Sequence, residues 1–409
     1  MNETKYKHTE LGPIPEHWEL RQWQYLLQEN VTTNTDCKET HQLQFKYGDI
    51  VSKANQEVAA DTLKIISKYT KVQPNDIMIN GLNLNYDFIS QRIGMVRTNG
   101  IITSAYISLR PTEEANPSYY NYLLKAMDAQ KMFHGMGTGV RLTLSYKELK
   151  NKYLPFPPLA EQEAMVAYLD EQTGKIDAAI EREQKMIDLL NERKQIIIQQ
   201  AVTKGLNPNA TMKDSGVEWI GEIPEGWNVK KIKFLFDLIT KRSCSEKKIG
   251  LENIESKSGK YIETYSIYDG NGIAVEKGDI VYGKLRPYLC KAWLAEWECN
   301  AVGDFYVFRS KGDIEPQYAQ LLFLSKAFSD ECTAATYGAK MPRVSSDFIR
   351  SLSFAYPSSK EQKEILVYLE EKLAGIDRAI EAREKMIALL QERKQIIINE
   401  VVTGKIKVL

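Results

Sequence analysis

Two segments of the chain, residues 161–204 and 361–404, show the hydrophobic periodicity of long amphipathic helices. In each segment two interleaved series of mostly apolar residues recur every seven positions, with charged residues between them. This is the a and d pattern of coiled-coil heptads, and the apolar stripe is narrower than that of a globular core helix. Two unrelated surface helices would not both keep the heptads, so we predict that the segments pair as an antiparallel coiled coil. The predicted seam residues are Leu169, Ile176, Ile180, Ile187, Leu190, Ile197, Leu369, Ile376, Ile380, Ile387, Leu390 and Ile397.

The two helical segments are also copies of one another. The sequence ERKQIII at 192–198 recurs unchanged at 392–398, 200 positions later. The pairs Glu161-Gln162 and Ile176-Asp177 recur at the same offset. A seven-residue identity inside a longer ungapped match indicates an internal duplication.

A second repeat precedes each helical segment. GPIPEHW at 12–18 resembles GEIPEGW at 221–227, and we expect Trp18 and Trp227 to anchor these two openers in a core. The chain is therefore built twice, each half being an opener, a variable stretch and a long helix.

The variable stretches, residues 19–153 and 228–353, have a mixed pattern. Short apolar runs bounded by turn residues predict strands, and longer runs that begin at a proline predict helices. The expected strands are 76–79, 101–109, 279–282 and 305–308, and the expected helices are 117–132 and 316–328. The two stretches share this plan but differ in local sequence, which predicts one fold with two different surfaces and suggests two recognition modules.

These patterns together predict an α+β architecture with a pseudo-twofold relation. Two similar globular domains of mixed helix and strand are separated by two long helices that form the antiparallel coiled coil. The expected boundaries are 1–153 for the first globular domain, 154–206 for the first long helix, 207–220 for a linker, 221–353 for the second globular domain and 354–409 for the second long helix.

Composition narrows the classes of function. The 409 residues include 54 Lys and Arg and 54 Asp and Glu, which excludes a protein that coats nucleic acid by gross basicity. Both variable stretches carry a slight excess of basic residues, whereas the helical segments carry a slight excess of acidic ones. Positive charge on the modules suits a reader of nucleic acid, although ordinary surface scatter explains an excess this small.

No apolar stretch is long enough for a membrane span, and the polar start MNETKYKHTE lacks the apolar core of a signal peptide. The five cysteines form no C-x-x-C pair, which speaks against a zinc site or a disulfide framework. We therefore expect a cytoplasmic protein with reduced thiols and no contact with a membrane.

The chain resembles the specificity (S) subunits of type I restriction–modification enzymes. The resemblance rests on the openers, on the run GDIVYGKLRP at 278–287, on PPLAEQ at 157–162 and on the duplicated ERKQ helices. It covers essentially the whole chain, and the order of the parts matches as well as the motifs.

This resemblance implies a function in DNA recognition. Each globular domain would be a target-recognition domain that reads one half of a bipartite site in double-stranded DNA, and the long helices would set the unread spacer. Two methyltransferase (M) subunits would dock on the chain and use S-adenosylmethionine to methylate adenine. Restriction (R) subunits would cleave DNA after translocation driven by ATP with Mg²⁺.

We find no catalytic, cofactor-binding or metal-binding motif in the chain. Phe156-Pro157-Pro158 lacks the amide or carboxylate that an adenine methyltransferase places before its two prolines, and a P-loop is absent. We therefore expect a non-catalytic subunit that binds no cofactor. The alternatives are a stand-alone DNA methyltransferase or nuclease, and a coiled-coil scaffold that binds only proteins.

Loops that follow the first strand motif of each module, and the Gly-bearing loops that close each module, offer the residue types that read bases. Arginine and lysine pair with guanine, and asparagine pairs with adenine. For each residue a surface or structural role competes with DNA contact. The candidate DNA-binding residues are Asn80, Asn83, Asn85, Arg141, Lys284, Arg286, Tyr288, Lys291, Lys340 and Arg343.

Overall fold

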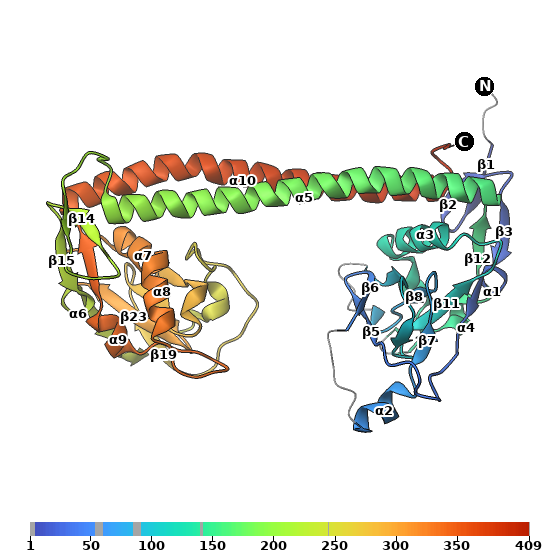
Figure 1. The fold of residues 1–409 in the computed structure, drawn as a ribbon, viewed down its shortest axis with the longest axis horizontal. Coiled ribbons are helices and arrows are strands. Elements are labelled where there is room, and N and C mark those ends of the chain that lie inside the picture. The colour runs from blue at the N-terminus through green and yellow to red at the C-terminus, as the bar shows by residue number, and fades with distance from the viewer. Residues whose placement is uncertain (1–4, 54–59, 85–90, 140–141, 244, 409) are drawn as a thin grey trace. The chain divides into compact units, whose positions relative to one another are not determined.

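A computed structural model describes residues 5–53, 60–84, 91–139, 142–243 and 245–408 (Figure 1). The chain divides into two compact units. Unit 1 comprises Met1–Gln184 and Glu384–Leu409, and unit 2 comprises Lys185–Arg383. Each unit contains one globular domain, the first part of the long helix that follows it, and the last part of the other long helix.

The two long helices are α5 (Leu159–Lys204) and α10 (Ser359–Val402). Prolines precede both helices, and an acidic residue in the first turn, Glu161 or Glu361, complements the positive end of the helix dipole. Each helix is followed by a glycine with a positive φ, 69° at Gly205 and 71° at Gly404. This left-handed conformation ends an α-helix. It favours glycine, because glycine has no Cβ that would clash with the backbone.

The sheet at the centre of unit 1 has four antiparallel strands in the order β4 (Leu27–Glu29), β11 (Ile107–Pro111), β8 (Ile77–Ile79) and β9 (Ile93–Met95). Helix α3 (Pro117–Ala129) packs on this sheet, and its buried residues enter the main core of the unit. The side chain of Asn116 caps α3 by accepting bonds from the amides of Ser118 and Tyr119.

Short elements complete unit 1. These are the hairpin β1 (Tyr6–Thr9) and β2 (Gly12–Pro15), the pair β3 (Glu19–Gln22) and β12 (Tyr153–Phe156), the pair β5 (Leu43–Lys46) and β6 (Asp49–Ser52), the pair β7 (Thr70–Val72) and β10 (Gly100–Ile102), the helices α1 (Trp23–Leu26), α2 (Ala60–Ile66) and α4 (Tyr146–Leu149), and the 3₁₀ turn η2 (Met132–Met136).

Unit 2 repeats the central sheet of unit 1. Its strands run in the order β16 (Phe236–Ile239), β23 (Phe305–Ser310), β20 (Ile280–Gly283) and β21 (Ala292–Leu294), again all antiparallel. Helices α7 (Pro316–Leu324) and α8 (Lys326–Ala334) supply buried residues to the same core. The equivalent order of strands confirms that the sequence repeat is a repeat of the fold.

A second four-stranded sheet distinguishes unit 2. It has the order β17 (Arg242–Ser243), β19 (Gly272–Val275), β22 (Cys299–Ala301) and β18 (Lys248–Ile249), with a parallel pair between β18 and β22. The other elements are the hairpin β13 (Met212–Asp214) and β14 (Glu222–Pro224), the pair β15 (Asn228–Lys231) and β24 (Ser353–Tyr356), the helices α6 (Ile232–Leu235) and α9 (Ser346–Ser351), and the 3₁₀ turns η3 (Leu251–Asn253) and η4 (Pro287–Leu289).

Two predicted elements differ from those observed. The helix expected at 316–328 is interrupted at Ser325, whose backbone is extended and whose hydroxyl donates to the Leu322 carbonyl at 2.7 Å. The strand expected at 101–109 is two strands, β10 and β11. Between them the Thr103 hydroxyl accepts a local bond from the Ala105 amide at 3.4 Å, and this turn sends the two strands to different sheets.

Within each unit the two long helices lie side by side and run antiparallel (Figure 1). In unit 1 the Lys394 ammonium bonds to both carboxylate oxygens of Asp177 at 2.7 Å. In unit 2 Lys194 donates to Asp377 at 2.6 Å. The two aspartates belong to the repeated Ile-Asp pair, and the two lysines belong to the repeated Glu-Arg-Lys-Gln motif. In each unit, therefore, the aspartate of one helix copy pairs with the lysine of the other helix copy.

The structure buries or half-buries all twelve predicted seam residues. Leu169, Ile176, Ile187 and Leu369 are buried, and the other eight are half-buried. Within the described residues, no helix is both long enough and apolar enough to cross a membrane.

Candidate nucleic-acid interface

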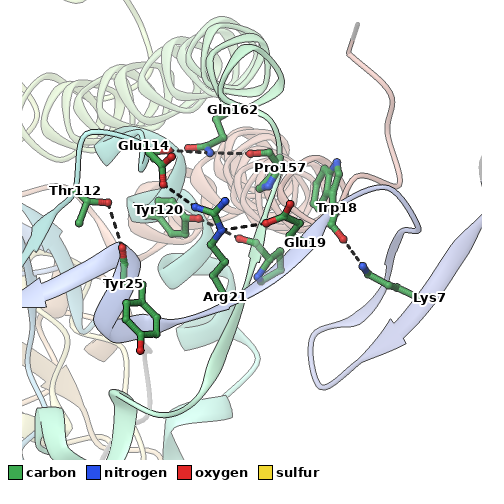
Figure 2. Close-up of polar contacts among 11 residues, drawn as sticks. Lys7, Trp18, Glu19, Arg21, Tyr25, Thr112, Glu114, Tyr120, Pro157 and Gln162 are labelled. Carbon is green, nitrogen blue, oxygen red and sulfur yellow. Dashed lines mark hydrogen bonds and ion pairs between the residues drawn. The ribbon is translucent and has the colours of Figure 1, made fainter.

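A buried glutamine in the first turn of each long helix binds two segments. One is the loop that precedes the long helix, and the other is the segment that follows the central sheet. In unit 1 the Gln162 side chain is fully buried and donates to the Pro157 carbonyl at 2.9 Å (Figure 2). It also accepts from the Asn116 amide at 2.8 Å. In unit 2 Gln362 makes the equivalent bonds to the Pro357 carbonyl and the Glu315 amide. The repeated Gln therefore connects each long helix to its domain.

The glutamate just before this glutamine, Glu161 or Glu361, binds the tryptophan of the opener in each unit. The indole of Trp18 donates to Glu161 at 2.8 Å, and that of Trp227 donates to Glu361 at 3.1 Å. Both tryptophans are 2% exposed, as expected of core anchors. A Cβ added at Gly404 would lie 2.8 Å from the Trp18 ring, so the end of α10 packs directly on the opener of unit 1.

Arg21 on β3 also serves the framework of unit 1. Its guanidinium donates to Glu114 at 2.6 Å and to Glu19 at 3.1 Å (Figure 2). The guanidinium also lies 3.7 Å from the centre of the Phe156 ring. Lys7 donates to the Trp18 carbonyl in the same region (Figure 2).

A second repeated contact positions the strand that precedes each candidate loop. Asp76, at the start of β8, is 1% exposed and receives two bonds from Arg110, at 2.9 and 2.8 Å. Asp279, at the start of β20, is 2% exposed and receives two bonds from Arg309, both at 2.8 Å. These ion pairs were not predicted from the sequence. The Asp-Ile dipeptide that begins both strand motifs was the available signal, because it occurs in both copies.

In unit 1 the loop after β8 is organised by Arg92, which is 7% exposed. Its guanidinium donates to the carbonyls of Asn80, Leu82 and Asn83 at 2.9, 2.7 and 3.1 Å. This buried cation therefore fixes the backbone of the predicted DNA-binding loop. Reading the sequence did not single it out.

The candidate residues of unit 1 have different environments. The side-chain oxygen of Asn80 accepts a bond from the Leu82 amide at 3.2 Å, so it serves the loop itself. Asn83 is exposed and has a φ of 52°. Asn85 and Arg141 lie outside the described residues.

Three of the cationic candidates of unit 2 have partners within the fold. Arg343 makes a two-bond ion pair with Asp304, at 3.0 and 2.9 Å, and hydrogen bonding from this guanidinium lowers the pKa of the Asp304 carboxyl. Lys291 donates to the Leu251 carbonyl at 2.6 Å, and burial lowers its pKa. Lys284 lies 3.8 Å from Asp304 and 5.1 Å from the centre of the Tyr306 ring.

The other three candidates of unit 2, Arg286, Tyr288 and Lys340, are exposed. In the described part of the chain, no hydrogen bond or ion pair joins their side chains to another residue. These three side chains are therefore accessible to a ligand.

In both units the loop after the strand and the closing loop are joined through the backbone. In unit 1 the Leu144 amide donates to the Gly81 carbonyl at 2.9 Å, and a Cβ at Gly81 would lie 2.4 Å from the Leu144 carbonyl oxygen. In unit 2 the Arg286 amide donates to the Pro342 carbonyl at 2.8 Å. In unit 2 the two groups of candidates therefore lie together, and in unit 1 the loop after β8 lies against the residues that follow the closing loop.

Among the described residues, no group of three or more His, Cys, Asp or Glu side chains could hold a metal ion. Burial raises the pKa of the Cys299 and Cys332 thiols to about 12, so these thiols stay protonated at neutral pH.

Comparison with known proteins agrees with this organisation. The family model for the type I restriction modification DNA specificity domain matches residues 45–188 and 224–386. The MjaVIII specificity subunit of Methanocaldococcus jannaschii, a type I restriction enzyme subunit, is 26% identical over 381 residues, covering 86% of this chain and 84% of its own length. A putative type I MjaX specificity subunit of the same organism is 24% identical over 439 residues, covering 99% and 97%.

The fold has a relative among solved structures. A chain from a study of complex assembly and conformational transition of the type I R-M system superposes with a TM-score of 0.65 at 13% identity, covering 96% of this chain and 99% of that one. Two matches to the family model, one in each unit's domain, correspond to two target-recognition domains. The chain therefore belongs to the family of type I restriction–modification DNA specificity subunits.

Proposed function

We propose that the chain reads a bipartite site in double-stranded DNA, one half-site for each target-recognition domain, without catalysing a reaction itself. The observation that carries this proposal is the contrast between framework and loops. The Asp–Arg, Trp–Glu and Gln contacts recur in both units, whereas the loops they position differ in residue type. A repeated scaffold with divergent loops is suited to reading two different short sequences.

The residue types of the two loops support separate specificities. The loop after β8 exposes Asn83, an amide suited to adenine, whereas the loop after β20 exposes Arg286, a cation suited to guanine or phosphate. In this proposal residues 1–153 and 221–353 are the target-recognition domains, 207–220 the linker, and 154–206 and 354–409 the spacer helices.

The partners follow from the same proposal. The duplicated helices offer two equivalent sets of contacts for two methyltransferase subunits, and restriction subunits join the assembly that these form. S-adenosylmethionine, ATP and Mg²⁺ would be bound by those partners and not by this chain. Because such a complex would act on DNA inside the cell, we expect the chain in the cytoplasm.

Mapping of methylated adenines in cells tests the proposal. Cells that carry the chain with its methyltransferase partner should show methylation at one bipartite sequence, which is lost when the chain is deleted. Replacing residues 19–153 by the corresponding stretch of another family member should change one half-site and leave the other unchanged. If both half-sites changed together, the assignment of one half-site to each domain would be wrong.

The enzymatic alternative predicts a different result. A stand-alone methyltransferase or nuclease would transfer a radiolabelled methyl group to DNA, or cut it, when the purified chain is assayed alone. A scaffold that binds only proteins would join the methyltransferase complex without changing which DNA sequence the complex retains. We expect no turnover by the isolated chain and a sequence preference that depends on it.

A further inference from the structure

In unit 2 the residues Tyr337–Arg343, called here the closing hairpin, form a tight backbone loop. The amide of Tyr337 donates to the Arg343 carbonyl at 2.9 Å, and the amide of Arg343 donates back to Tyr337 at 3.0 Å. The neighbouring Val344 amide donates to the Lys284 carbonyl at 3.2 Å. Together with the bond from the Arg286 amide to the Pro342 carbonyl, this bond joins the closing hairpin to the loop after β20.

The side chain of Arg343 points back into the unit. Its Nε and Nη2 donate to the two carboxylate oxygens of Asp304, the residue before β23, and its Nη1 donates to the Met341 carbonyl of the hairpin at 3.3 Å. The Asp304 carbonyl accepts from the Lys284 amide at 2.9 Å. An arginine whose guanidinium N–H groups already donate to a carboxylate cannot also pair with a guanine, because both interactions use the same donors. Arg343 therefore ties the closing hairpin to the central sheet.

The loop after β20 is held rigidly as well. Arg286 and Cys290 both have left-handed backbones, with φ of 50° and 49°, and they flank the turn η4. Ser329 on α8 donates to the Pro287 carbonyl at 3.1 Å, and the Cys290 thiol lies 3.1 Å from the Ser329 hydroxyl. Such unfavourable backbone conformations persist only where the surroundings fix them, and they are concentrated at functional sites.

The exposed side chains of these two segments have the chemistry of a DNA reader. Tyr337 is 58% exposed, Met341 46% and Tyr288 50%, beside the accessible cations Arg286 and Lys340. Aromatic and cationic groups presented on a rigid loop suit stacking and hydrogen bonding to base edges.

We propose that the closing hairpin and the loop after β20 form the base-reading element of unit 2, in which Lys340 and Arg286 contact guanine and Arg343 is a positioning residue. This inference rests on the proposed function and specifies it. Guanine offers two adjacent acceptors, O6 and N7, in the major groove, and lysine and arginine are the side chains that bind them best. The half-site read by unit 2 therefore contains a G·C pair whose recognition depends on these cations.

Mapping of methylated adenines in cells with the chain and its methyltransferase partner tests the base contacts. Lys340→Ala and Arg286→Ala should each relax the requirement for one guanine in one half-site and leave the other half-site unchanged. The preference for that guanine should fall about 5- to 150-fold, the range that a good base contact contributes. Lys277→Ala is the matched control. Lys277 is an exposed lysine that precedes the first residue of β20, whereas the candidate loop follows the last residue of that strand. It should leave both half-sites unchanged.

The role of Arg343 needs a different readout. Arg343→Met and Asp304→Asn should have the same effect, weaker binding of the complex to its own site at unchanged base preference, since each breaks the same ion pair. If Arg343 instead contacted a base, Arg343→Met would relax one position. Asp304→Asn would then preserve or strengthen binding, since it removes a negative charge near DNA. That result would overturn the positioning role.

The outcomes separate this inference from the proposed function. No sequence-specific methylation with the unaltered chain would contradict the proposed function itself. Specific methylation that stays unchanged in both Lys340→Ala and Arg286→Ala would overturn the inference alone. A loss of affinity that is equal for all sequences would also overturn it, because it indicates phosphate contacts.

Discussion

At the scale of single residues, the cations near the candidate loops have two different roles. Arg92, Lys291 and Arg343 are engaged by carbonyl or carboxylate oxygens of their own unit. Arg286 and Lys340 are exposed to solvent. Residue type alone does not separate the two roles, because the same guanidinium that reads guanine also satisfies buried carbonyl groups.

The Asp279–Arg309 pair leads to a prediction about stability. Arg309→Met leaves the Asp279 carboxylate, 2% exposed, without its two strongest donors. We expect a loss of about 2–3 kcal/mol in the free energy of unfolding, the cost of leaving a buried charged group partly unsatisfied. Urea denaturation measures it, with Arg286→Met as the control. That exposed substitution should change the stability by less than about 0.5 kcal/mol.

The Asp304–Arg343 pair leads to a prediction about pH. The pair lowers the pKa of the Asp304 carboxyl in the folded state, so its contribution to stability is present above the unfolded pKa, about 4. It is lost as the pH falls through the lower folded pKa. The difference in unfolding midpoint between the unaltered chain and Asp304→Asn should therefore shrink from pH 7 to pH 3. A difference that stays constant would show that the carboxylate charge does not matter.

At the scale of elements, the long helices combine local and tertiary signals. The heptads make a seam, but the repeated Asp and Lys positions set how the helices align within each unit. An apolar seam by itself tolerates shifts of register, whereas two charge pairs related by the internal repeat favour a single alignment.

Charge reversal tests this alignment. Asp177→Lys would place two lysines together in unit 1 and should destabilise the chain by about 0.5–1 kcal/mol, a small value because the pair is partly exposed. Adding Lys394→Asp should restore the stability. A double-mutant cycle measured by thermal unfolding at low and high salt gives the coupling, which should weaken with salt. A coupling of zero at low salt would contradict a role in alignment.

At the scale of the whole molecule, α5 and α10 each contribute to both units. The length of these helices is therefore a property that neither domain controls. In the proposed function it determines how many unread base pairs separate the two half-sites.

A matched insertion tests that relation. One heptad added after Gln184 in α5 and one after Arg383 in α10 keeps the seam in phase. We expect the mapped methylation site to gain unread base pairs while both half-sites keep their bases. Insertion of the same residues into the exposed turn at Lys277 is the control and should leave the spacer unchanged. A change in the bases read after the heptad insertions would show that the helices contribute to base recognition.

The sequence by itself determined the duplication, the long helices and the plan of the two domains. Heptads and repeats are local patterns with a fixed period, so they can be read without knowing the fold. It also placed both loops of each domain among the candidates. Only the tertiary structure decided that the two segments meet in each domain, since residues 81 and 144, or 286 and 342, come together only when the chain folds.

The tertiary structure also decided which cations hold the framework. The bonds of Arg343 to Asp304 and of Arg92 to three carbonyls join residues that no local period connects. The same holds for the break at Ser325, where a local side-chain bond competes with helix propensity. The free energy of burying and pairing a charge depends on its neighbours in space, and a linear pattern contains no record of them.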